Sequence, residues 1–103
     1  KEFFNSLFSD LSYLENIVAD WLSKHNIEYI RQYKYPFRDS NRFVDFYLPK
    51  LNIFIEVDGE FWHKNCKDID KLKDDLALSD GIKTIRISSK DRIINVLNEN
   101  IIR

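Results

Sequence analysis

Two acidic residues lie inside strand-like apolar runs of this sequence, where a charge needs a chemical reason. Asp45 interrupts the apolar run 43–48, and Glu56 lies within the run 52–58. Both runs are apolar on both faces, which is typical of central strands that are covered on two sides. Carboxylates in such strands can share a proton, pair with a basic neighbour or hold a divalent cation.

The register of the hairpin formed by these two strands decides whether the acids meet. With a turn at residues 50–51, the expected cross-strand partners are Leu48 with Ile53, Tyr47 with Phe54, and Asp45 with Glu56. Opposed residues have Cβ atoms about 5 Å apart, and like charges so placed destabilise a sheet by up to about 1 kcal/mol. The alternative is a different register that leaves the acids at strand ends in water.

Repulsion between the two carboxylates has to be offset. The candidates are a shared proton, a basic neighbour such as Arg42 or Lys34, and a bound divalent cation. Mg²⁺ suits hard oxygen ligands and takes one or two protein carboxylates, with waters and substrate phosphates completing its octahedron. We therefore expect a Mg²⁺ site at Asp45 and Glu56.

Glu15 is a third acid in an unusual position. It lies four residues after Leu11 and three before Val18, so helical geometry places it on the apolar stripe of a helix. It can belong to the same site. The alternative is a carboxylate at the edge of the stripe that reaches solvent or pairs with a Lys.

His63 follows the second acidic strand and can move a proton at neutral pH. Asp70, near the start of the next helix, can accept a hydrogen bond from its imidazole. The alternatives are an ordinary surface His and a solvated acid favoured by the helix dipole. A structural zinc site at His63 and Cys66 is not expected, because the sequence has no second Cys and only one other His.

The elements that must position these residues follow from hydrophobic periodicity and turn residues. We expect a short helix over 2–8, a helix from Ser9 or Asp10 to Lys24, strands over 28–35, 42–48, 52–58 and 83–88, a helix over about 68–79 ended by Gly81, and a last helix that carries Ile93, Leu97 and Ile101 and is capped by Ser88 and Ser89. This order of helix, three strands, helix, strand and helix predicts an α/β fold.

Length and composition agree with one such domain. The 103 residues are 44% hydrophobic with two Gly and two Pro, too apolar for a disordered chain and too poor in turn formers for a many-stranded sandwich. A single Cys fits a reducing compartment, and no apolar run is long enough for a membrane span, so we expect a soluble, cytoplasmic protein. With 16 Lys and Arg against 17 Asp and Glu, net charge does not favour a nucleic-acid partner.

Two segments together resemble the PD-(D/E)XK nuclease superfamily. They are RFVDFYLPKLNIFIEVDGEFWH, residues 42–63, and DIDKLKDDLALSDGIKTIRI, residues 68–87. The most similar branch is that of the very short patch repair endonucleases and the EDxHD homing endonucleases, and the resemblance covers roughly residues 11–88. It implies a restriction-endonuclease-like core with a central mixed four-stranded sheet flanked by helices.

The resemblance also implies roles for individual residues. Glu15, Asp45, His63 and Asp70 match the catalytic positions of the family, and Glu56 matches the second acid of the superfamily pattern. Asp45, Glu56 and the backbone carbonyl of Val57 would hold Mg²⁺, for which Mn²⁺ would substitute. Apart from the resemblance, Lys34, Arg38 and Arg42 are expected phosphate contacts because they lie in the loop beside the strand hairpin; the alternative is that they are surface basic residues that are only solvated.

The sequence departs from the family in two places. Asp58 stands where the family has a Lys, two residues after the second acid. Proton transfer is therefore expected to depend on His63. The Cys and His zinc site of the patch repair enzymes cannot be built here. These departures favour a homing-type or other phage or bacterial relative over mismatch repair itself.

The resulting expectation is a single metal-dependent DNA endonuclease domain over residues 1–103. Because the chain begins at Lys1 and is nearly neutral, we expect a separate DNA-targeting domain outside it. The alternatives are a nuclease-fold domain that binds nucleic acid or protein without catalysis, and an enzyme that acts on RNA or a small phosphate ester.

Overall fold

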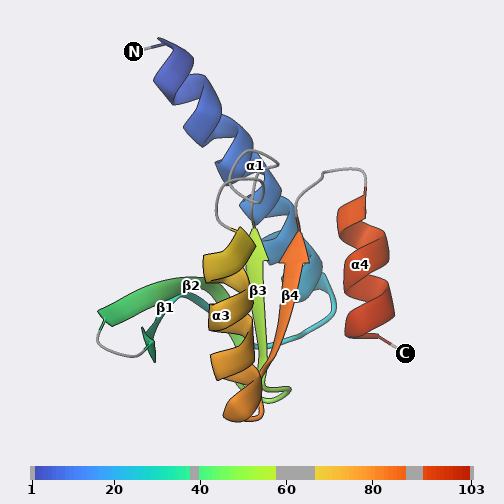
Figure 1. Ribbon diagram of the computed structural model, residues 1–103. Coiled ribbons are helices and arrows are strands. Elements are labelled where there is room, and N and C mark those ends of the chain that lie inside the picture. Colours follow the sequence, from blue (N-terminus) through green and yellow to red (C-terminus); the bar gives the residue numbers. More distant parts are fainter. Residues whose placement is uncertain (1, 38–39, 58–66, 88–91, 103) are drawn as a thin grey trace.

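A mixed four-stranded sheet forms the centre of the fold (Figure 1). The computed structural model describes residues 2–37, 40–57, 67–87 and 92–102. In chain order the elements are α1 (Glu2–Lys24), β1 (Ile30–Phe37), β2 (Ser40–Leu48), β3 (Ile53–Val57), α3 (Lys67–Ser79), β4 (Lys83–Ile87) and α4 (Ile93–Asn100). The strands lie in the order β1-β2-β3-β4; the first two pairs are antiparallel and β3 with β4 is parallel. This confirms the expected α/β class and element order.

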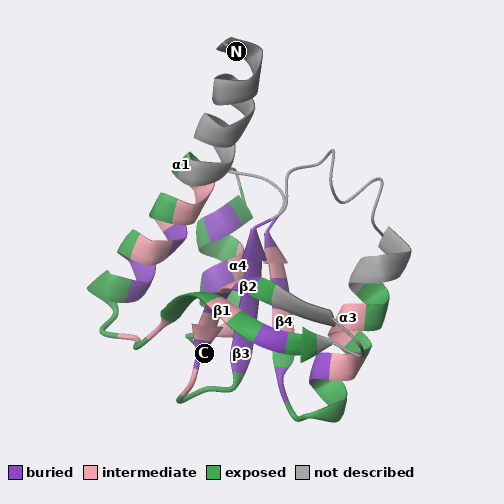
Figure 2. Cartoon of the chain, turned by 90° about the vertical axis from the view of Figure 1, so that its left-hand side faces the viewer, coloured by how far each residue is buried: buried purple, intermediate pink, exposed green. Residues whose placement is uncertain are grey.

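Helices cover both faces of the sheet, which gives three layers (Figure 2). Helices α1 and α4 pack on one face around Phe46 and Ile55, and α3 packs on the other around Phe54. Every residue of β3 is buried, because this strand lies between two neighbours and under helices on both sides. Full burial of a side chain such as Phe46 or Phe54 contributes about 2–3 kcal/mol.

The predicted register of the β2–β3 hairpin is confirmed. Leu48 pairs with Ile53 and Tyr47 with Phe54, across a turn that spans residues 49–52. The four-residue turn is closed by the Leu51 N–H, which donates to the Leu48 carbonyl oxygen at 3.2 Å. Turn length and the alternation of side chains together determine the register.

The start of the chain differs from the prediction. Helix α1 is continuous over Glu2–Lys24, whereas we expect a short helix over 2–8 followed by a second helix from Ser9 or Asp10. No Gly or Pro separates the two segments. Without such a break, Ser9 and Asp10 continue the helix rather than cap a new one.

Other boundaries shift by one or two residues. β1 begins and ends two residues later than predicted and includes Pro36, which an edge strand accommodates because its outer N–H positions need no partner. Helix α4 begins at Ile93 with Arg92 at the N-cap and no side-chain cap bond, and the expected capping residues Ser88 and Ser89 lie outside the described residues. No described helix is both long enough and apolar enough to cross a membrane.

The prediction that β2 is covered on both faces is only half right. Its last residues, from Phe46 to Leu48, pair with β3 and are buried or half-buried. Phe43, nearer the start of the strand, is 60% exposed. At this point α3 covers only the face that carries Val44, which is buried, and Phe43 points to the other face.

Two helices end in the same hydrogen-bonded motif with a left-handed residue. After α3, Ile82 N–H donates to the Ala77 carbonyl oxygen and Gly81 N–H to that of Leu78, both at 2.9 Å, with φ of Gly81 at 82°. After α1, Asn26 takes the equivalent position with φ at 56°. Gly81 therefore ends α3 as predicted. Asn26 ends α1 in the same way, at a higher conformational cost than a Gly would have.

Replacing Gly81 by Ala is expected to lower the free energy of unfolding by about 1–2 kcal/mol, the cost of a left-handed conformation for an L residue. A Cβ at Gly81 would meet no atom within 4 Å, so the cost is conformational. Asn26→Gly, the matched control, should change the free energy of unfolding by less than about 1 kcal/mol and in the stabilising direction. Urea unfolding of both variants measures this, and equal effects would contradict it.

Tyr35 connects β1 to the end of α3. Its hydroxyl donates a hydrogen bond to Asp80 Oδ2, and its ring packs edge-on against Phe54 with centroids 5.0 Å apart. Burial of the hydroxyl, together with the hydrogen bond to and the charge of Asp80, raises the pKa of Tyr35 to about 12. The protonated phenol is therefore the form that the folded protein stabilises.

Tyr35 should make the protein lose stability between about pH 10 and about pH 12. The unfolded chain releases the tyrosine proton near its ordinary pKa of about 10, whereas the folded protein holds that proton until about pH 12. In this range, the free energy of unfolding should decline less steeply in Tyr35→Phe than in the wild type. Urea titrations across the range test it, and identical slopes would show that the phenol does not contribute.

Candidate functional site

Asp45 and Glu56 lie where β2 and β3 separate. Paired residues of the two strands extend from Leu48 with Ile53 as far as Phe46 with Ile55. Beyond this point β3 continues beside β4, and β2 continues beside β1. The two acids are the next residues on their strands, so the confirmed register brings them together at this fork.

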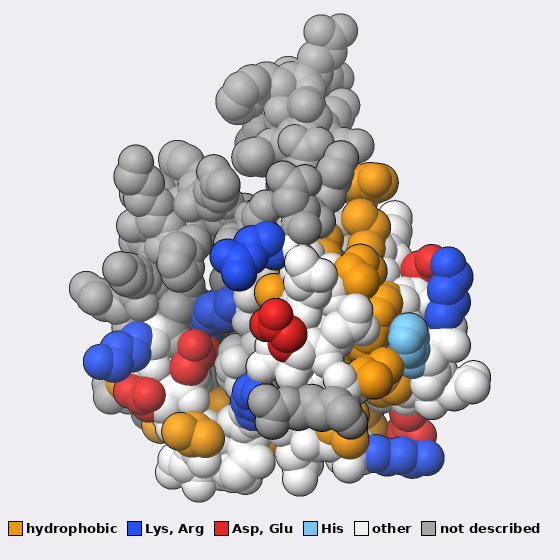
Figure 3. Space-filling view, turned by 90° about the vertical axis from the view of Figure 1, so that its right-hand side faces the viewer, with side chains coloured by type: hydrophobic (Ala, Val, Ile, Leu, Met, Phe, Trp, Pro, Cys, Tyr) orange, Lys and Arg blue, Asp and Glu red, His pale blue; other side chains and the backbone are white. Residues whose placement is uncertain are grey.

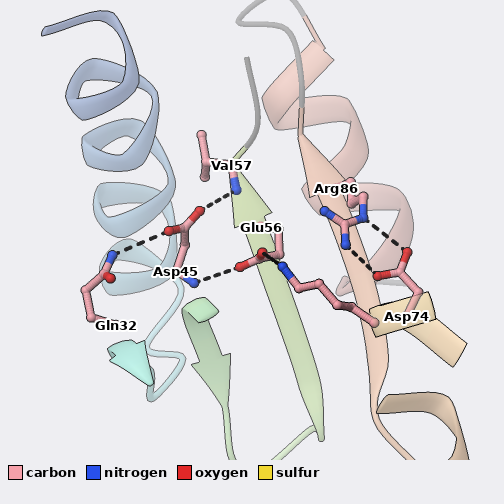
Figure 4. Close-up of polar contacts among 7 residues, drawn as sticks. Gln32, Asp45, Glu56, Val57, Asp74 and Arg86 are labelled. Carbon is pink, nitrogen blue, oxygen red and sulfur yellow. Dashed lines mark hydrogen bonds and ion pairs between the residues drawn. The ribbon is translucent and has the colours of Figure 1, made fainter. Parts of the chain in front are cut away.

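The acids close the fork by reciprocal bonds between side chain and backbone (Figure 4). The Asp45 N–H donates to Glu56 Oε1 at 2.9 Å, and the Val57 N–H donates to Asp45 Oδ2 at 2.7 Å. We call this arrangement the carboxylate clasp. It satisfies backbone N–H groups that would otherwise lack sheet partners where the strands diverge.

The remaining carboxylate oxygens of the clasp also receive donors. Gln32 Nε2 lies 3.4 Å from Asp45 Oδ1, and Lys73 Nζ lies 3.6 Å from Glu56 Oε2. The Lys73–Glu56 pair is largely buried, with side chains 18% and 11% exposed. Lys73 from α3 is thus a base that offsets the charge of the acidic pair. Of the two basic neighbours named as candidates above, Lys34 is exposed on β1, and the side chain of Arg42 lies outside the described residues.

A second ion pair lies beside Lys73. Arg86 of β4 binds Asp74 of α3 through two contacts, Nη2 to Oδ1 at 2.7 Å and Nε to Oδ2 at 3.1 Å. Both pairs line a small, half-open pocket between α3 and the sheet. The carboxylate clasp therefore borders a concave surface whose acids and bases balance.

Gln32 lies beside the clasp in an unusual backbone conformation. Its φ is 51°, and the pair between Gln32 and Asp45 is missing from the β1–β2 ladder. At the same point β2 changes face, because Val44 packs on the α3 side whereas Phe46 packs under α1. In a regular strand residues two apart share a face, so β2 is distorted at Asp45, the residue that Gln32 contacts.

Glu15 is held by a different partner. Its Oε1 lies 3.0 Å from Nη2 of Arg31, whose guanidinium lies over the Phe46 ring at 5.3 Å from the centroid. This ion pair corresponds to the alternative given above, in which the Glu15 carboxylate pairs with a base at the edge of the apolar stripe of the helix. The base is Arg31 rather than a Lys. Among the described contacts Glu15 is joined to Arg31 and not to the clasp.

The other predicted site residues are only partly described. His63 and Arg38 lie outside the described residues, and for Asp70 in α3 and Arg42 in β2 the backbone alone is described. Lys34 is exposed on β1, opposite Phe43. Val57, expected as a ligand through its carbonyl, meets Asp45 through its N–H.

Lys73, Gln32 and Arg31 are the site neighbours that sequence reasoning missed. Only Lys73 left a signal: it lies three residues before Leu76 and four before Ala77, on the face of α3 that packs on the sheet. A Lys at such a position needs an acid within reach. The Gln32 distortion has no comparable signature in the sequence.

The carboxylate oxygens of the clasp are the kind of ligand that a hard cation prefers. Two carboxylates are within the number that Mg²⁺ takes from a protein, and each carboxylate has about four acceptor positions. Within residues 2–37, 40–57, 67–87 and 92–102, no group of three or more His, Cys, Asp or Glu residues gathers as a metal site. Waters and a substrate phosphate would complete the coordination of a cation held here.

Searches against known protein families, curated proteins and solved structures find no significant match to this chain.

Replacing Lys73 by Met is expected to lower the free energy of unfolding by about 1–3 kcal/mol, because it removes the ammonium group from a largely buried carboxylate. Glu56→Gln in the same chain should recover part of this loss. Lys50→Met is the matched control, since Lys50 pairs with Glu28 at 3.8 Å in solvent, and it should cost less than about 1 kcal/mol. A double-mutant cycle by urea unfolding measures the coupling, and a value near zero would contradict it.

Proposed function

We propose that this chain is a metal-dependent endonuclease domain that hydrolyses phosphodiester bonds in DNA. The observation that carries the proposal is the meeting of Asp45 and Glu56 at the β2–β3 fork, at the edge of a pocket. Hard divalent cations bind such paired carboxylates, and they also bind phosphate oxygens. The resemblance of residues 42–63 and 68–87 to PD-(D/E)XK nucleases supports the same reaction.

Mg²⁺ held by Asp45 and Glu56 would supply charge stabilisation to a phosphate in its transition state. Lys73 keeps the Glu56 carboxylate in place and offsets part of the acidic charge. It provides, from α3, the positive charge that the sequence lacks two residues after Glu56. His63 is proposed to accept the proton of the attacking water and Asp70 to orient its imidazole.

A second candidate is supported by the contacts within the clasp itself. Each of the four carboxylate oxygens of Asp45 and Glu56 already has a donor, so the clasp also serves to close the sheet. This structural role alone would account for the two acids in a nuclease-fold domain that binds nucleic acid without cutting it. Activity with and without a divalent cation distinguishes the two candidates.

The test is incubation of supercoiled plasmid with the purified chain in Mg²⁺, in Mn²⁺ and in EDTA. Wild-type protein should nick or linearise the plasmid only with a divalent cation. Asp45→Asn should slow cleavage at least about a hundredfold, the scale of a lost electrostatic contact to the transition state. Its fold should persist, because the amide oxygen can still accept the Val57 N–H.

Asp20→Asn is the matched control, because Asp20 is 65% exposed on α1 and pairs only with Lys24 among its described ion pairs. Prepared in the same way, it should cut at the wild-type rate. Equal activity of Asp45→Asn and the wild type would rule out Asp45 as a metal ligand. Absence of metal-dependent cleavage by the wild type would overturn catalysis and leave the second candidate.

A further inference from the structure

The β1–β2 pair projects from the body of the protein as a two-stranded ribbon. Between residues 40 and 44, β2 pairs with β1 alone. In Figure 1 this part extends away from β3 and β4, and one face of it lies under no helix. We call residues 33–37 with 40–44 the ribbon.

The two faces of the ribbon differ in burial. Tyr33, Tyr35 and Val44 point toward α3 and belong to its apolar cluster. Lys34 and Phe43, directly opposite one another in the register, alternate with them and are exposed. The outward face therefore presents an aromatic ring, 60% exposed, beside an ammonium group.

Positive charge concentrates in this part of a nearly neutral chain. Residues 30–48 contain four Lys and Arg against two Asp, a net charge of +2, so the remaining residues carry −3. On the opposite side of the molecule acidic and basic side chains are interspersed (Figure 3). Of the four cations, Lys34 is exposed on the ribbon and Arg31 pairs with Glu15, whereas the side chains of Arg38 and Arg42 lie outside the described residues. The ammonium group of Lys34 complements a phosphate of a polyanion.

An exposed aromatic ring next to a cation fits one kind of polyanion well. A base stacks on such a ring whatever its sequence, and the neighbouring ammonium pairs with the backbone phosphate. A base inside a duplex already has a neighbour on each face. Stacking on an exposed ring therefore favours a strand whose bases are unpaired.

Phe43 also lies at a useful distance from the carboxylate clasp. It precedes Asp45 by two residues, a rise of about 7 Å along a strand. Phe43 therefore lies close to the clasp along β2, on the face of the ribbon turned away from α3.

We propose that the outward face of the ribbon binds an unpaired DNA strand, with a base stacked on Phe43 and a phosphate on Lys34. The position of this contact rests on the proposed function, because it places the strand beside the acids. The substrate class is then DNA with a single-stranded or locally opened segment.

Binding is measured in EDTA at low ionic strength, with a short single-stranded oligonucleotide that carries 2-aminopurine, so that no cleavage can occur. Wild-type protein should bind it, quench its fluorescence by stacking, and prefer it to the same sequence as a duplex. Phe43→Val keeps a strand-forming residue and removes the ring; it should weaken binding about five- to 150-fold and abolish the quenching. Phe43→Trp should restore both.

Two controls separate stacking from charge and from general surface effects. Leu78→Val alters a side chain that is 67% exposed at the end of α3, and binding should not change. Lys34→Gln should weaken binding to all sequences and reduce the slope of log affinity against log salt by about 1, with quenching retained. Thermal melts check that each variant is folded.

No measurable binding by the wild type would overturn the proposal, as would equal binding by Phe43→Val and the wild type. The latter result would leave Phe43 as a contact for protein. Failure of the nuclease proposal has a different outcome: ring-dependent binding would persist in EDTA while no cleavage occurs with Mg²⁺. Cleavage at the wild-type rate by a Phe43→Val chain with undiminished binding would overturn the ribbon contact alone.

Discussion

The carboxylate clasp between β2 and β3 is the interaction on which the other features of the site depend. Where two strands diverge, their N–H groups lose sheet partners, and a buried donor without a partner costs about 1–3 kcal/mol. Asp45 and Glu56 each accept the backbone N–H of the facing strand. The acids thereby let β2 leave the sheet at a defined residue, which frees the ribbon to project.

The clasp in turn depends on α3. Two acids at one fork repel each other, and the compensating charge comes from Lys73, on a helix that joins β3 to β4. That helix is held by Ala77 in the core, by the Asp74–Arg86 pair and by the hydrogen bond from Tyr35 to Asp80. The packing of the apolar face of α3 on the sheet thus places the positive charge of Lys73 next to Glu56.

Strand β1 carries a backbone distortion beside the clasp. Its Gln32 adopts a left-handed φ in mid-strand, a conformation that costs an ordinary residue about 1–2 kcal/mol. The distortion coincides with the change of face in β2 and with the amide contact to Asp45. Backbone strain is retained where the surrounding structure requires it, and here it lies beside the proposed active site.

Local spacing determined much of this protein by itself. The period of apolar residues sets the order of helices and strands, and the hairpin length with its alternation places Asp45 against Glu56. Gly81 ends α3 because only a residue tolerant of positive φ closes that motif. The tertiary structure alone decided the charge partners, Lys73 for Glu56 and Arg31 for Glu15, and the distortion at Gln32. These contacts join residues 13 to 17 apart or depend on how three layers pack, and no local period or turn rule carries that information.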